Sequence, residues 1–156
     1  MNRVLAAALA IFLLDQLSKL AVVQWLGLKT IGSFAVFPPF LTFQMAWNRG
    51  VNFGLFSNDA EFMRWLLAGL AVAVSVWLLR WARQLKHWSG WLSAGLVIGG
   101  AMGNAMDRVV YGAVADFLNM SCCGLNNPYA FNIADIAIFA GAFGVVLFSN
   151  KHDNKG

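Results

Sequence analysis

Four of the seven acidic residues in this chain lie in or beside long apolar stretches, at Asp15, Asp107, Asp116 and Asp135. A carboxylate near hydrocarbon is costly to keep there, so it is by default a candidate functional group. Asp116 and Asp135 are the most informative pair, because they flank one short connection at the same side of a predicted bilayer. Two carboxyl groups held close at low dielectric share a proton, so the pair can supply both a base and an acid. This chemistry is that of an aspartic protease, which activates water without a metal.

The same aspartates also have structural and transport interpretations. Asp135 could place a negative charge in the first turn of a helix, where the helix dipole favours an anion. Intramembrane aspartates also mark proton and ion pathways. The spacing alone leaves catalysis, transport and helix capping open.

Two further groups of polar residues have helical spacing. Asn104, Asp107 and Arg108 lie at i, i+3 and i+4, where Arg108 could neutralise Asp107 or hold a carboxylate or a ligand oxygen. A local cluster that packs helices explains these three equally well. Asp15 and Lys19 have the i, i+4 spacing of a helical ion pair. Structural pairing is the preferred interpretation of these two, and contact with a lipid headgroup is the alternative.

Metal and redox chemistry find little support in the sequence. His87 and His152 are expected on the cytoplasmic side, away from the carboxylates. Cys122 and Cys123 are adjacent, whereas metal sites and redox motifs typically space their cysteines as CxxC. We expect small loop residues at these two positions, with a redox role as the alternative. No metal or other cofactor is expected.

Four stretches are apolar and long enough to cross a hydrocarbon core, which takes about 20 helical residues. They cover approximately residues 4–26, 62–82, 88–110 and 131–148. The composition agrees, because 60% of the residues are hydrophobic and 12% are charged, against about 45–50% and 25% in soluble proteins. The sequence therefore predicts one integral membrane domain over residues 1–156, with an uncleaved first span.

The connection 27–61 carries a strand pattern. After Pro38 and Pro39, apolar residues alternate with polar or small ones from Leu41 to Trp47, which is the period of a strand with one apolar face. With the apolar 31–37 stretch, this pattern indicates a small sheet within about 28–57. The predicted fold class is an all-α membrane protein of four transmembrane helices, with a small β-sheet on the extracytoplasmic face.

Basic residues indicate the orientation. Arg80, Arg83 and Lys86 surround the connection between the second and third spans, whereas residues 111–130 contain no Lys or Arg. The positive-inside rule then places both termini in the cytoplasm and the connections 27–61 and 111–130 outside. The basic residues do not form one face with interleaved aromatic residues, so nucleic acid is not an expected partner.

Glycines recur at intervals of four in the third span, at Gly95, Gly99 and Gly103. Small residues on one helix face let another membrane helix approach closely. A phosphate-binding loop would need a strand before the helix, which this segment lacks. We therefore expect these glycines to serve helix packing.

Five motifs occur in order along the chain: Asp15–Lys19, Asn48–Gly54, Gly99–Arg108, Val114–Phe117 and Phe131–Asp135. Together, from about residue 12 to residue 140, they closely resemble the lipoprotein signal peptidase family, also called signal peptidase II. Each motif alone is weak, but five in order in a four-span chain of this size are specific. The chain departs from the family at Val51 and Asn52, where small residues are common.

The resemblance implies an aspartyl endopeptidase of the bacterial inner membrane. Its substrate would be a diacylglyceryl-modified prolipoprotein, cut just before the lipid-modified cysteine, and the strand at 41–47 could hold the extended peptide. Asp116 and Asp135 match the catalytic pair. Supporting or substrate-binding positions would be Asp15, Lys19, Asn48, Gly50, Asn104, Asp107, Arg108 and Asn132. The expected partners are this substrate and membrane lipid, and the enzyme is expected to act as a monomer.

Two other functions compete with peptidase activity. A proton-coupled transporter would need titratable groups near the bilayer midplane, commonly within a duplicated architecture. Only Asp15 and Lys19 are expected so deep, and no internal repeat is evident. A quinone-linked thiol oxidase would need separated cysteine pairs that exchange disulfides, and the sequence offers one adjacent pair.

Overall fold

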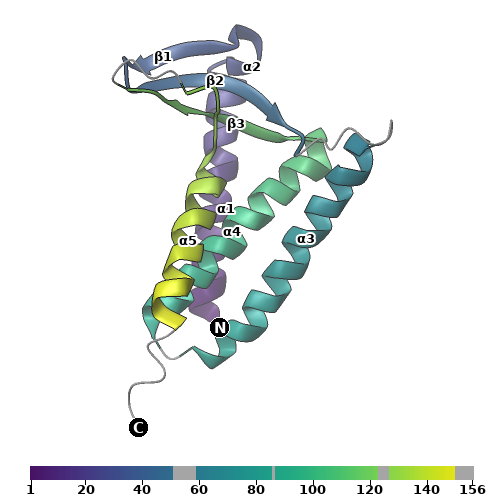
Figure 1. Cartoon of the computed structure of the whole chain (residues 1–156), viewed down its shortest axis with the longest axis vertical. Helices are drawn as coiled ribbons and strands as arrows, with labels where there is room; N and C mark the ends of the chain where they lie inside the picture. Colours follow the sequence, from purple (N-terminus) through teal and green to yellow (C-terminus); the bar gives the residue numbers. More distant parts are fainter. Residues whose placement is uncertain (51–58, 86, 123–126, 150–156) are drawn as a thin grey trace.

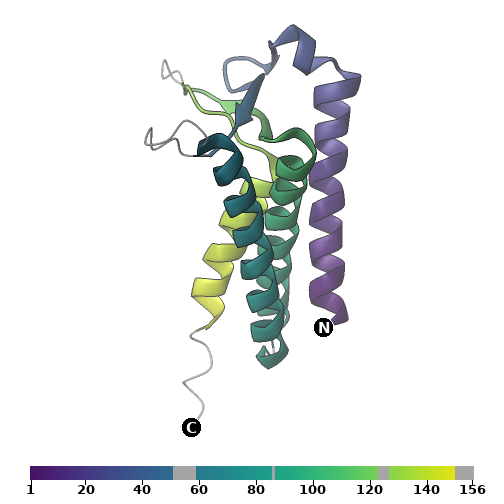
Figure 2. The same cartoon turned by 90° about the vertical axis from the view of Figure 1, so that its right-hand side faces the viewer.

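The chain folds into four long helices with a three-stranded sheet at one end (Figure 1). The computed structural model describes residues 1–50, 59–85, 87–122 and 127–149. The long helices are α1 (Asn2–Lys19), α3 (Asp59–Trp81), α4 (Trp88–Tyr111) and α5 (Ile133–Ser149). A π-helical segment over Leu20–Trp25 extends α1. Both views place the sheet at one end of the helices and the N-terminus at the other (Figure 1, Figure 2).

The helices coincide with the four predicted spans to within three residues at each described boundary. Two of them, covering Asn2–Trp25 and Glu61–Gln84, are long and apolar enough to cross a membrane, judged over the residues that the structure describes. Helix α4 is long enough, but several glycines and polar residues lower its hydropathy. Helix α5 offers a shorter apolar stretch, Ile133–Phe148. The helical architecture is confirmed, and four membrane crossings stay a prediction.

Helix α4 is the centre of the bundle, because it packs against α1, α3 and α5. Its glycines make these contacts close. A Cβ atom built on Gly99 would meet the carbonyl oxygen of Ala8 in α1. A Cβ atom on Gly100 would lie 2.5 Å from the carbonyl oxygen of Ala134 in α5. The predicted packing role of the glycine stripe is therefore confirmed, and it extends to a second helix face.

We expect Gly99→Ala to destabilise the protein by about 1–3 kcal/mol, because the added methyl group forces two backbones apart. Gly69→Ala in α3 is the matched control, since a Cβ there has nothing within 4 Å. That control should be neutral or stabilising by up to about 1 kcal/mol, as alanine favours helix over glycine. Thermal unfolding in detergent measures both. Equal stability of Gly99→Ala and wild type would contradict the packing role.

The sheet contains strands β1 (Ser33–Phe37), β2 (Leu41–Asn48) and β3 (Val114–Met120), antiparallel in that order. A short helix, α2 (Leu28–Ile31), precedes β1. The first two strands were predicted from sequence, but β3 was missed because 111–130 was interpreted as a plain connection. β3 is mostly buried, and Asp116 and Asn119 interrupt its apolar pattern. The part of the predicted β region beyond residue 50, residues 51–57, lies outside the described residues.

The end of α4 directs the chain into β3. Gly112, at φ 77°, ends the helix in a left-handed conformation that glycine adopts without strain. Arg64 of α3 donates from Nε to the carbonyl oxygen of Arg108 and from Nη2 to that of Val109, at 2.7 and 2.9 Å. These bonds satisfy helix carbonyls that have no partner within the helix. The chain therefore passes from the end of α4 into β3 at a fixed position relative to the helix bundle.

Candidate active site

Asp116 lies in β3 with 2% of its surface exposed. Its Oδ1 atom accepts a hydrogen bond from Nδ2 of Asn132 at 2.6 Å, and Oδ2 accepts one from Nδ2 of Asn48 at 3.0 Å. The pairing of β2 with β3 shifts register between Phe43 and Ala46, which places Ala46 opposite Asp116. Such bulges re-aim side chains beside functional sites. The register places Asn48 close enough to contact the carboxylate.

Asp135 lies in the first turn of α5 and is partly exposed. Its Oδ2 atom accepts from the backbone N–H of Asn132 at 3.2 Å, while its own N–H donates to Oδ1 of Asn132 at 2.9 Å. This reciprocal pair is a capping box. Its Oδ1 atom accepts from Nδ2 of Asn104 at 2.8 Å. The helix-capping interpretation of Asp135 is therefore confirmed, and one carboxylate oxygen also faces the neighbouring helix.

A short bridge brings the two aspartates together. The backbone N–H of Phe131 donates to the carbonyl oxygen of Leu118 at 3.0 Å, and that of Leu118 donates to Phe131 at 2.8 Å. The start of α5 is thereby held against β3. Asn132, which is fully buried, then contacts Asp116 through its side chain and Asp135 through its backbone. Both aspartates predicted from sequence share this one neighbour.

The environment of Asp116 changes its acidity. Burial and, to a smaller extent, the negative charge of Asp135 raise the pKa of this carboxyl from 3.8 to about 6. Hydrogen bonds from Asn48 and Asn132 oppose that rise, because they stabilise the ionised form. Asp116 therefore holds a proton at a higher pH than an ordinary aspartate does. This effect of the Asp135 charge on the pKa of Asp116 is the kind of interaction that a shared-proton pair requires.

A buried ion cluster lies beside the two candidate aspartates and contacts the chain segments that carry them. Nζ of Lys19 lies 2.7 Å from Oδ2 of Asp15 and 2.7 Å from Oδ2 of Asp107. The predicted pair of Asp15 and Lys19 is thus present, and Asp107 extends it across helices α1 and α4. Lys19 also donates to Oδ1 of Asn104 at 3.3 Å. Asn104 in turn donates to Asp135, so the cluster reaches the candidate site through one amide.

The two acids of the cluster also hold the backbone beside each aspartate. Oδ2 of Asp107 accepts from the N–H of Ala115, the residue before Asp116, at 3.1 Å. Oδ1 of Asp15 accepts from the N–H of Ala134, the residue before Asp135, at 3.0 Å. Anionic acceptors make strong hydrogen bonds to backbone N–H groups. The cluster therefore fixes both chain segments that carry the candidate pair.

Gln16 is a member of this network that sequence reasoning missed. Its Nε2 atom donates to Oδ1 of Asp107 at 3.0 Å, to Oδ2 of Asp15 at 3.1 Å and to the carbonyl oxygen of Gly103 at 3.2 Å. The available signal was a second polar residue directly after Asp15 in an apolar helix. Gln16 links α1 to α4 at the level of the ion cluster.

The remaining predicted residues also lie near this end of the bundle. Oδ1 of Asn48 accepts from the N–H of Gly50 at 2.9 Å, and Gly50 has a φ of 89° that favours glycine. Arg108 does not neutralise Asp107, because Lys19 forms that ion pair instead. Nη1 of Arg108 donates to the carbonyl oxygen of Asn104 at 3.2 Å, and its buried Nε atom has no hydrogen-bond partner within the described residues.

Metal-ligating residues do not gather at this site. The described part of the chain contains no group of three or more His, Cys, Asp or Glu residues that could hold a metal ion. His87 precedes α4 at the end of the bundle opposite the sheet. His152 and Cys123 lie outside the described residues. The redox interpretation of the adjacent cysteines is therefore not tested.

Comparison with known proteins extends these observations to a family. The model of the signal peptidase (SPase) II family matches residues 7–151. A lipoprotein signal peptidase of Methylobacterium sp. (strain 4-46) is 42% identical over 156 residues, covering 97% of this chain and 91% of the relative. A lipoprotein signal peptidase of Aeromonas hydrophila subsp. hydrophila is 38% identical, covering 95% and 88%.

A solved structure described as a bacterial membrane enzyme, determined in meso at 1.9 Å resolution, has the same fold. Its TM-score is 0.80 at 24% identity, covering 97% of this chain and 95% of that one. A second, determined at 2.3 Å, has a TM-score of 0.77 at 23% identity. Together with the apolar helices, the family match identifies a membrane protein. The chain belongs to the signal peptidase II family of lipoprotein signal peptidases.

Proposed function

We propose that this chain is an aspartyl endopeptidase that removes the signal peptide from diacylglyceryl-modified prolipoproteins, cutting just before the lipid-modified cysteine. Family membership supports the reaction and the substrate class. The single observation that carries the mechanism is the contact of Asn132 with both Asp116 and Asp135. The raised pKa of Asp116, about 6, lets this pair retain one proton at a higher pH than an ordinary aspartate would.

The pair acts by direct attack of water on the scissile carbonyl, without a covalent intermediate. One carboxylate takes a proton from the attacking water, and the other carboxyl group donates a proton during collapse to the leaving amine. Asn48, Asn104 and Asn132 each donate to a carboxylate oxygen and hold these oxygens in place. The starting proton belongs to the pair rather than to either residue.

The sheet constrains where the substrate peptide can lie. Strand β2, which was expected to hold it, is the middle strand, and its first half, residues 41–44, pairs with β1 on one edge and β3 on the other. The peptide therefore cannot add to that half of β2 as a new strand. In our proposal it crosses the face of the sheet that carries Asn48 and Asp116. An extended peptide there presents a scissile bond free of helix hydrogen bonds.

We further propose that the active site faces the extracytoplasmic side of the inner membrane and that both termini are cytoplasmic. The basic connection between α3 and α4 supports this orientation. The N-terminus and the C-terminal end of α5 lie opposite the sheet (Figure 1). Each candidate residue comes from the same chain, which supports activity as a monomer.

The transporter alternative is weaker in the structure than in the sequence. Asp15 and Lys19 are engaged by each other and by Ala134, Asn104 and Asp107, in the halves of α4 and α5 that lie nearer the sheet. A transport pathway would need titratable groups at the midplane. The charged groups here instead support two short chain segments. The arrangement therefore favours a peptidase active site over a transport pathway.

Purified full-length protein should cleave a diacylglyceryl-modified precursor, and a mobility shift on a gel would measure the product. A carboxylate pair needs no metal, so we expect an unchanged rate after treatment with a chelator. The same precursor without the lipid serves as the control and should remain uncut. Loss of cleavage in chelator that divalent ions restore would contradict the proposed mechanism.

The pH dependence of cleavage should report the acidity of Asp116. We expect kcat/KM to decrease above a pH of about 6, where the pair loses its shared proton. Asn48→Ala removes a donor to the ionised carboxylate, which raises the pKa of Asp116 further. The pH above which kcat/KM decreases should therefore rise by roughly half to one pH unit. Gln44, which is exposed on β2, provides the control: Gln44→Ala should leave the pH dependence of kcat/KM unchanged. A downward shift in Asn48→Ala would contradict this assignment.

A further inference from the structure

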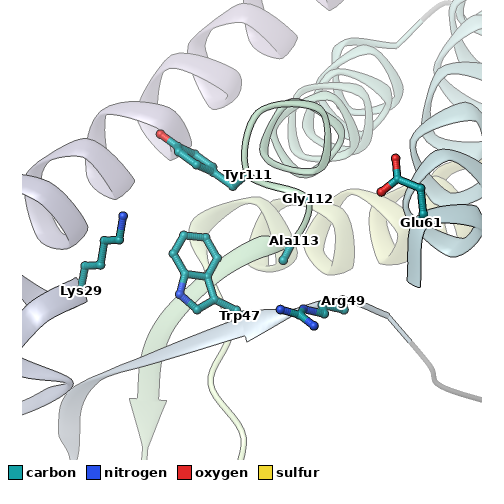
Figure 3. A pocket seen from close by; sticks show the side chains of 7 residues that line it. All are labelled: Lys29, Trp47, Arg49, Glu61, Tyr111, Gly112 and Ala113. Carbon is teal, nitrogen blue, oxygen red and sulfur yellow. The ribbon is translucent and has the colours of Figure 1, made fainter. Parts of the chain in front are cut away.

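A cavity of about 410 Å³ lies at the sheet end of the bundle, apart from the aspartate pair. Lys29, Trp47, Arg49, Glu61 and Tyr111 line it, together with the backbone turn at 112–113 (Figure 3). Successive residues of a strand point to opposite faces. Because Asn48 reaches Asp116, its neighbour Trp47 points to the other face of β2. The cavity is therefore separated from the proposed catalytic face by the sheet.

Two cations at this cavity are available to a ligand. Among the described residues, no carboxylate lies within ion-pair distance of Lys29 or Arg49. Glu61 is engaged elsewhere, since it accepts from Nη1 of Arg64 at 3.3 Å and from Nε1 of Trp65 at 2.8 Å. Figure 3 shows Lys29 and Arg49 on either side of the Trp47 ring. This charge pattern complements an anion.

A groove with a mainly apolar lining continues from the cavity, and Gln16, Lys19 and Asp107 of the ion cluster also line it. A second cavity of about 260 Å³ shares Trp47 and Tyr111 and extends along α1 past Leu13, Leu17 and Leu20. All three leucines are exposed on the helix surface. The rings of Trp47 and Tyr111 lie 5.8 Å apart at the junction. Aromatic residues of this kind favour the headgroup level of a bilayer.

We propose that this face binds one anionic phospholipid of the surrounding membrane. The headgroup phosphate lies at Lys29 and Arg49, the glycerol region lies against Trp47 and Tyr111, and one acyl chain follows the leucines of α1. The combination of cations above an apolar groove has the polarity of such a lipid. The diacylglyceryl group of the proposed substrate carries no phosphate, so it would not require the two cations. This site goes beyond the proposed peptidase function and is tested independently of cleavage.

Native mass spectrometry of the full chain in neutral detergent, titrated with phosphatidylglycerol, tests the proposal. We expect one retained lipid. Lys29→Gln and Arg49→Gln should each weaken its binding about fivefold, and the double variant about twenty-five-fold, as cations near a lipid surface contribute independently. Lys29→Arg with Arg49→Lys keeps both charges and should retain binding. The matched control, Arg80→Gln with Arg83→Gln, removes the same charge at the opposite end and should lose less than about twofold.

Two competing ligands show whether the site binds an anionic lipid, any phospholipid or a free phosphate compound. Phosphatidylcholine with the same acyl chains carries an additional cation and should bind more weakly. Glycerol phosphate without acyl chains should not displace the lipid. Equal binding by the double variant and its control, or equal competition by phosphatidylcholine, would overturn the role of the cations. Displacement by glycerol phosphate would show a site for free phosphate compounds instead of a lipid.

Discussion

Asp116→Asn and Asp135→Asn are each expected to slow cleavage of the modified precursor at least about a thousandfold while the protein stays folded. An amide can neither take a proton from water nor return one to the leaving amine. The double variant should lose little more than either single variant, because residues that act as a unit are not additive in their effect on kcat. A mobility shift with limiting enzyme measures all three rates.

The stability of these variants separates chemistry from structure. Burial raises the pKa of Asp116 to about 6, so the folded protein binds this proton more tightly than the unfolded chain does. The contribution of Asp116 to stability therefore decreases as pH rises from 3.8 to about 6, and its ionised form is unfavourable at neutral pH. Asp116→Asn should consequently unfold within about 5 °C of the melting temperature of wild type.

Retention of substantial turnover by either single variant would contradict the catalytic assignment of that aspartate.

Lys19→Met is expected to have the largest effect on folding, a loss of about 3–5 kcal/mol. It leaves Asp15 and Asp107 buried without their shared cation, and each must then ionise in an apolar setting or take up a proton. Because these acids hold Ala115 and Ala134, activity should fall in parallel with stability. Thermal unfolding in detergent and the precursor assay measure the two effects.

Compensating changes test this explanation. Asp15→Asn combined with Asp107→Asn in the Lys19→Met background removes the unpaired charges and should recover a large part of the lost stability. Lys29→Met is the control, since this lysine is exposed and should change stability by less than about 0.5 kcal/mol. A Lys19→Met protein as stable as that control would show that the cluster does not hold the fold.

Local patterns were enough to predict the helices and part of the sheet. The long apolar stretches, the glycines at intervals of four and the alternation over 41–47 each depend on residues close in sequence. The missed strand β3 has no such pattern, because Asp116 and Asn119 occupy buried positions that a regular strand would fill with apolar residues. Its place in the sheet depends on pairing with β2, whose partner residues lie 66 to 79 positions earlier in the chain.

The candidate site shows the same division. Spacing alone identified the pair of Asp15 and Lys19, which is one helical turn apart. It could not choose between Arg108 and Lys19 as the partner of Asp107, because that choice depends on the packing of α1 against α4. The arrangement of Asn132 between two aspartates likewise follows from the bridge of Leu118 and Phe131. The catalytic roles themselves stay predictions until the variants are measured.

The asparagine donors around the pair also restrict what an inhibitor can look like. Each carboxylate oxygen of Asp116 and Asp135 already accepts one hydrogen bond from the protein. A carboxylate oxygen has about two acceptor positions, so a tetrahedral mimic with a hydroxyl in place of water has roughly one open direction at each oxygen. Compounds whose hydroxyl points along those directions should bind more tightly than their mirror-image forms. The configuration of the carbon that carries the hydroxyl would then decide inhibitor potency.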